Sequence, residues 1–300
     1  MTGENRAGLT RRTLVLGGAS IVALAGATVL GIDENLLPGR STMFRALGLD
    51  GPPGILPDVA TGPMLTGSFE SLKRLGKEVS WAVSYPLGTK PGDHLPVLIA
   101  LHGFGGSHRS AFGSRMGLQL FLTQAVRNGS RPFAIASVDG GNSYWHKRSS
   151  GEDSGAMVTD EFITVLANRG LDTSRVALLG WSMGGFGALY LASKLGQDKA
   201  AAVVAESPAI WFNSGQAAHG AFDSPADFNA CTPLGKQEQL DGIAVRVDCG
   251  IGDGFYPVAS SYVDGFQRRP AGGFVPGGHN LNYWRRMAPA QLAFVGAQFG

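Results

Sequence analysis

The sequence places a serine between glycines where it could act as a nucleophile. Residues 180–184 (GWSMG) match the pattern G-x-S-x-G, between an apolar run at 175–179 and a helical pattern at 183–195. In a strand–turn–helix context such a serine lies on a tight turn with its hydroxyl exposed. The N–H of Met183, at the start of the helix, can stabilise negative charge on a carbonyl oxygen. The pattern predicts that Ser182 attacks a carbonyl group.

A histidine base and an acid that orients it are expected downstream of Ser182, in the order serine, acid, histidine. His279 lies on a glycine-flanked loop before the last helical pattern, and we favour it over His219, which no strand precedes. Asp253 follows the apolar run 243–247 and is the predicted acid. Two rival acids also lie at the ends of predicted strands: Glu206 and Asp248.

A second glycine-rich loop follows an earlier apolar run. Residues 102–106 (HGFGG) come directly after 96–101 (PVLIAL). Esterases use a loop in this position to donate a second backbone N–H to the oxyanion. We predict that the N–H of Phe104 is this donor, and that His102 has a structural role.

The elements that must position these residues alternate between strands and helices. The apolar runs are too short for helices and too continuous for strands with one exposed face, which is typical of parallel strands buried on both faces. The predicted strands are 79–85, 96–101, 133–138, 175–179, 201–205 and 243–247, and the predicted helices are 115–127, 155–169, 183–195 and 283–298. This order predicts an α/β class: a mostly parallel, doubly wound sheet with helices on both faces.

Charge and composition exclude several function classes. Most of the formal net charge of +2 belongs to the first 27 residues, and the rest of the chain balances its acidic and basic side chains. No basic stripe is left for nucleic acid, so we expect none as a partner. The sequence has no P-loop, no HExxH, no calcium-loop pattern and no GxGxxG after its first strand. No cofactor and no metal are therefore predicted.

The N-terminal residues have the pattern of an export signal. Residues 11–12 (RR) precede an uncharged apolar run at 14–32, and residues 25–27 (AGA) offer a small-residue cleavage site. This pattern is typical of a twin-arginine signal peptide. An uncleaved membrane anchor stays open as the alternative, because the run is long enough to span a bilayer.

We therefore divide the chain into three parts. Residues 1–32 are expected to be a twin-arginine-type signal or membrane anchor, 33–63 a Gly/Pro-rich linker, and 64–300 the catalytic domain. The folded part is expected outside the cytoplasm, secreted or associated with the cell envelope, with a possible membrane tether through the N-terminal segment. In that compartment Cys231 and Cys249 can form a disulfide, and the alternative is two buried free thiols.

The motifs together resemble the esterase D-like branch of the α/β-hydrolases, which is related to the mycolyltransferases. Similarity is closest to secreted actinobacterial esterases. The segments that carry the resemblance are LHGFGG (101–106), DGGNSYWH (139–146), GWSMGGFGALYLA (180–192), DCGIGDGFY (248–256) and GGHNLNYW (277–284). The resemblance implies an α/β-hydrolase fold over 64–300, with Ser182, Asp253 and His279 as the catalytic set.

The same resemblance implies substrate-binding residues near the nucleophile. Trp145 and His146 follow the predicted strand 133–138, and the resemblance implies that their loop lines the acyl or alcohol pocket. An equal alternative is a surface loop anchored by one aromatic side chain. Trp181, beside the nucleophile, is a third candidate, with packing under the sheet edge as its alternative.

These expectations favour a serine carboxylesterase that acts on a small-molecule or lipid acyl ester. An acyltransferase that moves the acyl group to a sugar such as trehalose is the first alternative, since the same acyl-enzyme serves both reactions. A catalytically silent, envelope-binding protein is the second alternative.

Overall fold

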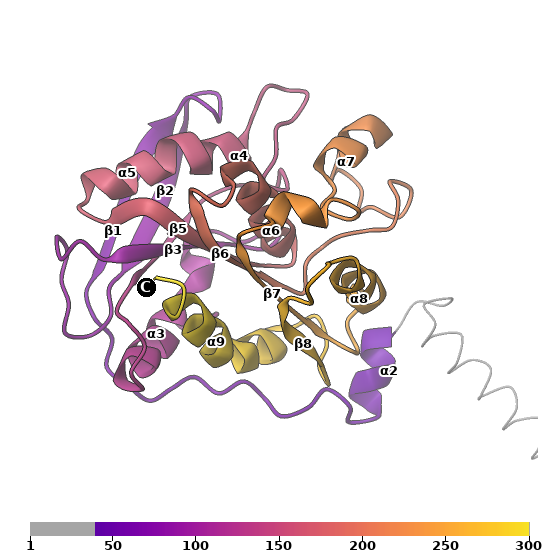
Figure 1. The fold of residues 1–300 in the computed structure, drawn as a ribbon, viewed down its shortest axis with the longest axis horizontal. Coiled ribbons are helices and arrows are strands. Elements are labelled where there is room, and N and C mark those ends of the chain that lie inside the picture. The colour runs from indigo at the N-terminus through magenta and orange to yellow at the C-terminus, as the bar shows by residue number, and fades with distance from the viewer. Residues whose placement is uncertain (1–39, 300) are drawn as a thin grey trace, which may run out of the picture.

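A central β-sheet organises the molecule (Figure 1). The computed structural model describes residues 40–299, and within them the sheet has eight strands in the order β1-β2-β4-β3-β5-β6-β7-β8. The strands are β1 (Met64–Ser71), β2 (Lys77–Ser84), β3 (Pro96–Leu101), β4 (Ala134–Val138), β5 (Asp172–Trp181), β6 (Ala200–Glu206), β7 (Ala244–Gly250) and β8 (Ala271–Val275). β2 pairs antiparallel with β1 and β4, and the other neighbouring pairs are parallel. This is the mostly parallel sheet of the α/β-hydrolase fold that the sequence predicts.

Helices cover both faces of the sheet (Figure 1). Helices α3 (Leu118–Arg127) and α9 (Leu281–Gly296) lie on one face, and α5 (Ile163–Asn168), α6 (Met183–Leu195) and α8 (Tyr256–Asp264) lie on the other. The remaining helical segments are α2 (Arg40–Ala46), η1 (His108–Ala111), α4 (Ser154–Ala156), the π-helical η2 (Met157–Phe162), α7 (Pro225–Cys231) and η3 (Gln237–Leu240). Two apolar cores result, one on each side of the sheet.

The two edge strands, β1 and β8, are the strands that the sequence pattern did not predict. Every residue of β3, β4 and β6 is buried, so these strands appear as continuous apolar runs. β1 alternates between exposed and half-buried residues, and β8 has no buried residue. Each of these edge strands has one neighbouring strand and leaves side chains exposed, and therefore lacks the apolar run on which the prediction depended.

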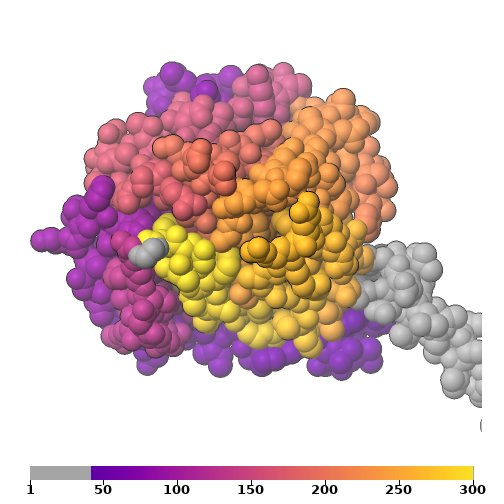
Figure 2. Space-filling model, viewed as in Figure 1, coloured from indigo at the N-terminus to yellow at the C-terminus, as the bar shows by residue number. Residues whose placement is uncertain are grey.

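The described part of the predicted linker lies against the catalytic domain. Phe44 of α2 is 7% exposed and packs beside Gly252. The guanidinium of Arg286 in α9 donates to the carbonyl oxygens of Asp50 (3.1 Å) and Pro52 (2.6 Å). Figure 2 shows helix α9, in yellow, between the indigo-to-magenta early segments and the orange later ones. This segment, residues 40–63, is called the lead-in below. It contacts helix α9, which follows the His279 loop.

Two further expectations concern the chain ends and the thiols. The predicted signal or anchor at 1–32 lies outside the described residues. Within residues 40–299 no helix is long and apolar enough to cross a bilayer. Cys231 and Cys249 are both buried and free, so the disulfide considered from the sequence is not formed.

Candidate active site

The turn between β5 and α6 fixes Ser182 in a conformation that serine rarely adopts. Its backbone angles are φ 57° and ψ −122°, which is a strained region for a residue with a side chain. A Cβ at Gly180 would lie 2.0 Å from the carbonyl oxygen of Gly184, and a Cβ at Gly184 would lie 2.0 Å from that of Leu101. Both glycines are therefore required for the close approach of helix α6 to the sheet.

Backbone hydrogen bonds hold this turn to the neighbouring strand. The Ser182 N–H donates to the carbonyl oxygen of Glu206 at 3.0 Å, and the Ala209 N–H donates to the carbonyl oxygen of Ser182 at 3.0 Å. Both partners come from the end of β6 and the residues after it. The strained serine is thus held from both sides, and its side chain is left free to face the carboxyl edge of the sheet.

A continuous hydrogen-bonded chain links Ser182, His279 and Asp253. His279 Nε2 lies 2.9 Å from Ser182 Oγ, and His279 Nδ1 lies 2.8 Å from Asp253 Oδ2. Asp253 is fully buried, and its Oδ1 accepts the N–H of Phe255 at 2.9 Å. With Asp253 ionised, Nδ1 carries the proton and Nε2 is free to accept the serine proton. The structure brings together the three residues that the sequence predicts as nucleophile, base and acid.

Aromatic rings and a helix cap fix the orientation of the imidazole. The His279 ring lies 5.3 Å from the Phe255 ring and 5.1 Å from the Trp284 ring, measured between centroids. The next residue, Asn280, caps helix α9 by accepting the N–H of Tyr283 at 3.1 Å. His279 is therefore fixed at a helix N-terminus, with 28% of its side chain exposed toward substrate.

The predicted oxyanion donors belong to two segments that lie next to the nucleophile. Met183 is the first residue of α6, so its N–H has no acceptor within the helix. Gly103 precedes the other donor, Phe104, and a Cβ at Gly103 would lie 3.4 Å from the Ser182 Cβ. The loop is held by Asn142, whose Oδ1 accepts the Gly105 N–H at 2.8 Å. Sequence reasoning missed Asn142, although it lies within the DGGNSYWH segment.

Three residues predicted to bind substrate lie inside the protein instead. Trp145 is 1% exposed, and its indole N–H donates to the carbonyl oxygen of His102 at 3.3 Å. His146 is completely buried, and Trp181 is 5% exposed and packs against Trp284. Each of these side chains is covered by other parts of the fold, which favours a packing role over the predicted substrate contact. Trp145 and Trp181 support the oxyanion loop from below.

A row of aromatic residues connects Phe104 with Phe255, the neighbour of His279. The ring of Phe104 is 63% exposed and lies 6.4 Å from the ring of Tyr144, which lies 5.8 Å from Trp211. Trp211 lies 5.7 Å from Phe255, the neighbour of His279. A pocket of about 390 Å³ opens here, lined by Ile210, Trp211, Phe212, Gln216, Gly254, Phe255, Pro257 and Val258. Half of this lining comes from the segment after β6, in which the sequence showed no readable motif, and the other half follows β7.

The two rival acids are buried under the site and do not contact the histidine. Asp248 binds the Arg246 guanidinium through both oxygens, at 2.7 and 3.0 Å, and also accepts from Gln291 at 3.0 Å. Glu206 is fully buried beside it, and burial, reinforced by the charge of Asp248, raises the pKa of Glu206 well above its usual range. Of the three candidate acids, Asp253 alone forms a hydrogen bond with His279.

The fold and this site define a serine hydrolase of the α/β-hydrolase class. A family model described as a putative esterase matches residues 73–257. The chain belongs to this esterase family, and it is a serine carboxylic ester hydrolase. The resemblance to esterases inferred from the sequence is thereby confirmed at the level of the family.

Solved structures of esterases share the fold. A ferulic acid esterase is 19% identical, over 80% of this chain and 100% of the other, with a TM-score of 0.68. An S-formylglutathione hydrolase from Agrobacterium tumefaciens is 16% identical over 83% of this chain and 100% of its own, with a TM-score of 0.66. A ferulic acid esterase from Anaeromyces mucronatus is 18% identical over 81% and 94%, also at 0.66. No curated protein matches the chain by sequence.

Proposed function

We propose that the protein hydrolyses carboxylic esters through an acyl-enzyme on Ser182. The observation that carries the proposal is the hydrogen-bonded chain from Ser182 Oγ through His279 to Asp253. His279 Nε2 takes the serine proton as Oγ attacks the ester carbonyl carbon, and the N–H groups of Met183 and Phe104 stabilise the oxyanion. The alcohol leaves with the proton from His279. Water then releases the acid by the same steps.

We propose that the pocket beside Phe255 receives the acyl group. It shares Phe255 with the His279 contact, and its aromatic lining from Trp211 and Phe212 suits a flat or short acyl chain. Structures with the same fold include a ferulic acid esterase in complex with ferulic acid and a feruloyl esterase module with sinapinate. Aryl and short-chain acyl esters are therefore the substrates to test first.

The N-terminal sequence supports a proposal about where the protein acts. Residues 11–12 and the apolar run 14–32 support export to the cell envelope or beyond it. Fractionation of cells that express the full chain tests this. Recovery of esterase activity in the cytoplasmic fraction alone would contradict export.

The mechanism is tested by covalent labelling. The full chain is treated with a fluorophosphonate, and intact mass is recorded beside the Ser182→Ala variant. The expected result is one adduct on the native chain and none on the variant, because only an activated serine attacks the probe. A folded native chain without an adduct would overturn the proposal and favour the silent, envelope-binding alternative.

The acyl acceptor is tested by product analysis. A short-chain or aryl ester is supplied with and without trehalose, and the products are separated by mass. Free acid in both reactions is expected for a hydrolase. An acylated sugar as the main product would replace hydrolysis with acyl transfer, which proceeds from the same acyl-enzyme.

A further inference from the structure

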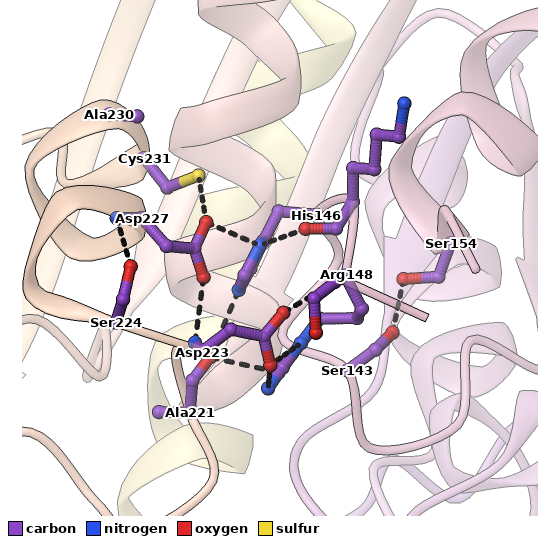
Figure 3. Close-up of polar contacts among 12 residues, drawn as sticks. Ser143, His146, Arg148, Ser154, Ala221, Asp223, Ser224, Asp227, Ala230 and Cys231 are labelled. Atoms are coloured by element: carbon purple, nitrogen blue, oxygen red, sulfur yellow. Dashed lines mark hydrogen bonds and ion pairs between the residues drawn. The ribbon is translucent and has the colours of Figure 1, made fainter. Parts of the chain in front are cut away.

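Three side chains of the kinds that ligate metals lie close together, outside the chain of hydrogen bonds that links Ser182, His279 and Asp253 (Figure 3). His146 comes from the loop after β4, and Asp227 and Cys231 come from helix α7. One ligand atom from each residue lies within 4.8 Å of the others. His146 and Cys231 are buried, while the Asp227 side chain is 20% exposed, so an ion could enter from solvent along this carboxylate.

Two of the three distances within this group suit a tetrahedral ion. His146 Nδ1 lies 3.6 Å from Asp227 Oδ1, and Cys231 Sγ lies 3.5 Å from the same oxygen. Zinc bonds of about 2.0–2.3 Å in a tetrahedron place their ligand atoms roughly 3.3–3.6 Å apart. The two measured separations therefore match the edges of a zinc site.

The surroundings of the imidazole independently indicate a cation. His146 Nε2 lies 3.0 Å from the carbonyl oxygen of Ala221, and Nδ1 lies 2.9 Å from that of Lys147. A neutral imidazole has one N–H, so only one nitrogen can donate. If Nε2–H donates to Ala221, the lone pair of Nδ1 faces the Lys147 oxygen and the Asp227 carboxylate. A cation between these atoms would remove the repulsion between the Nδ1 lone pair and the two oxygens. A metal-bound histidine usually donates its other N–H to a protein acceptor, which would here be the carbonyl oxygen of Ala221.

The other two ligands are also held in place by their neighbours. Asp227 Oδ2 accepts the N–H of Asp223 at 2.9 Å, which leaves Oδ1 for the cluster. The backbone N–H of Asp227 donates to Ser224 Oγ at 3.1 Å, where Ser224 caps α7. The nearby Arg148 is paired with Asp223 at 2.6 Å (Figure 3), so its charge is compensated.

We propose that His146 Nδ1, Asp227 Oδ1 and Cys231 Sγ bind one Zn²⁺ ion. Thiolate and imidazole together favour zinc over magnesium or calcium, which prefer oxygen ligands. Water or the Lys147 carbonyl oxygen completes the coordination. On binding, the thiol proton of Cys231 passes to solvent, and the sulfur that donates to Asp227 in the metal-free protein bonds the ion.

The ion would connect the loop after β4 with helix α7. His146 directly follows Tyr144 and Trp145, whose positive φ values of 56° and 59° mark a strained loop. Tyr144 lies next to Phe104, and Phe222, ahead of α7, stacks on His146 at 5.2 Å. Zinc therefore has a structural role: it cross-links the loop after β4 to helix α7. The two cysteines form no disulfide that could do this.

The test is zinc titration of the full chain after dialysis against a chelator. We expect one Zn²⁺ per chain by calorimetry, and an increase in Tm of about 5 °C at saturating zinc. Cobalt(II) in place of zinc is expected to give a thiolate charge-transfer absorption. Asp227→Asn and Cys231→Ser should each weaken zinc binding at least about tenfold, and Cys231→Ser should also remove the cobalt band.

Two control variants separate this site from other zinc binding. Cys249→Ser removes the other thiol of the chain and should retain the zinc and the cobalt band. His279→Ala removes the catalytic imidazole. This variant should still bind zinc, and zinc that it binds is not held by His279. The proposal is overturned if the native chain binds no zinc, or if Asp227→Asn and Cys231→Ser bind it as tightly as the native chain.

Discussion

Ser182 shows how one strained residue depends on its neighbours. Its φ of 57° costs roughly 1–3 kcal/mol for a residue with a side chain. The hydrogen bonds with Glu206 and Ala209, and the two glycines at 180 and 184, hold the turn in spite of this cost. In return, Oγ lies 2.9 Å from His279 Nε2, directly before the first residue of helix α6, Met183.

Replacement of Asp253 tests the acid at this scale. In Asp253→Asn the side-chain amide can no longer hold the imidazole as the tautomer with a free Nε2. We expect kcat to fall by about 10³–10⁴-fold with little change in KM, by analogy with the serine-protease triad. Steady-state kinetics on a short-chain ester measures this. Glu206→Gln is the matched control, since Glu206 does not contact His279, and a similar loss there would reassign the acid.

Glu206 also predicts a pH dependence of stability. Its pKa in the folded protein lies well above the usual 4.5, chiefly through burial. The folded state therefore binds a proton that the unfolded state releases, and stability falls as pH rises from about 4.5 toward the folded pKa. Because Gln cannot ionise, Glu206→Gln should raise Tm relative to the native chain, by more at pH 8 than at pH 5. An equal difference at both pH values would contradict the raised pKa.

At the scale of elements, helix α6 and strand β3 are separated only by glycine. A Cβ at Gly184 would lie 2.0 Å from the backbone oxygen of Leu101, which cannot move without displacing β3. Gly184→Ala should therefore cost about 3 kcal/mol or prevent folding. Chemical denaturation measures the loss. Gly273→Ala is the matched control, because a Cβ there meets no atom within 4 Å and its φ is not positive; a comparable loss in both would contradict the argument.

The sequence pattern predicts the elements whose burial is uniform. β3, β4 and β6 are buried throughout and mostly apolar, and the residues that follow the strands include Ser182 and Asp253. The edge strands β1 and β8 were missed because partial exposure removes their apolar runs.

Side-chain burial was harder to predict than strand position. His146 was expected near substrate but is covered by Phe222, a residue from a segment more than seventy positions later. The cluster of His146, Asp227 and Cys231 was missed for the same reason. Its ligands come from segments far apart in sequence, and no short motif joins them.

For the whole molecule, the lead-in segment and the catalytic histidine share one anchor. The Arg286 guanidinium donates to the carbonyl oxygens of Asp50 and Pro52 in the lead-in, and also to that of Pro276, which begins the His279 loop. Gly54 approaches the backbone of α9 so closely that a Cβ there would lie 2.4 Å from the Asn282 carbonyl oxygen. Positioning of His279 is therefore coupled to attachment of residues 50–54.

Removal of this anchor tests the coupling. Arg286→Ala leaves three carbonyl oxygens without their donor and frees the lead-in, so we expect a loss of about 2–3 kcal/mol and faster proteolytic cleavage near residues 47–57. Since the His279 loop loses the same partner, kcat should fall about tenfold while the fluorophosphonate adduct still forms, more slowly. Limited proteolysis with mass mapping, denaturation and kinetics measure the three effects. Arg268→Ala, an exposed arginine, is the control. A cleavable lead-in with unchanged kcat would show that the two segments are held independently.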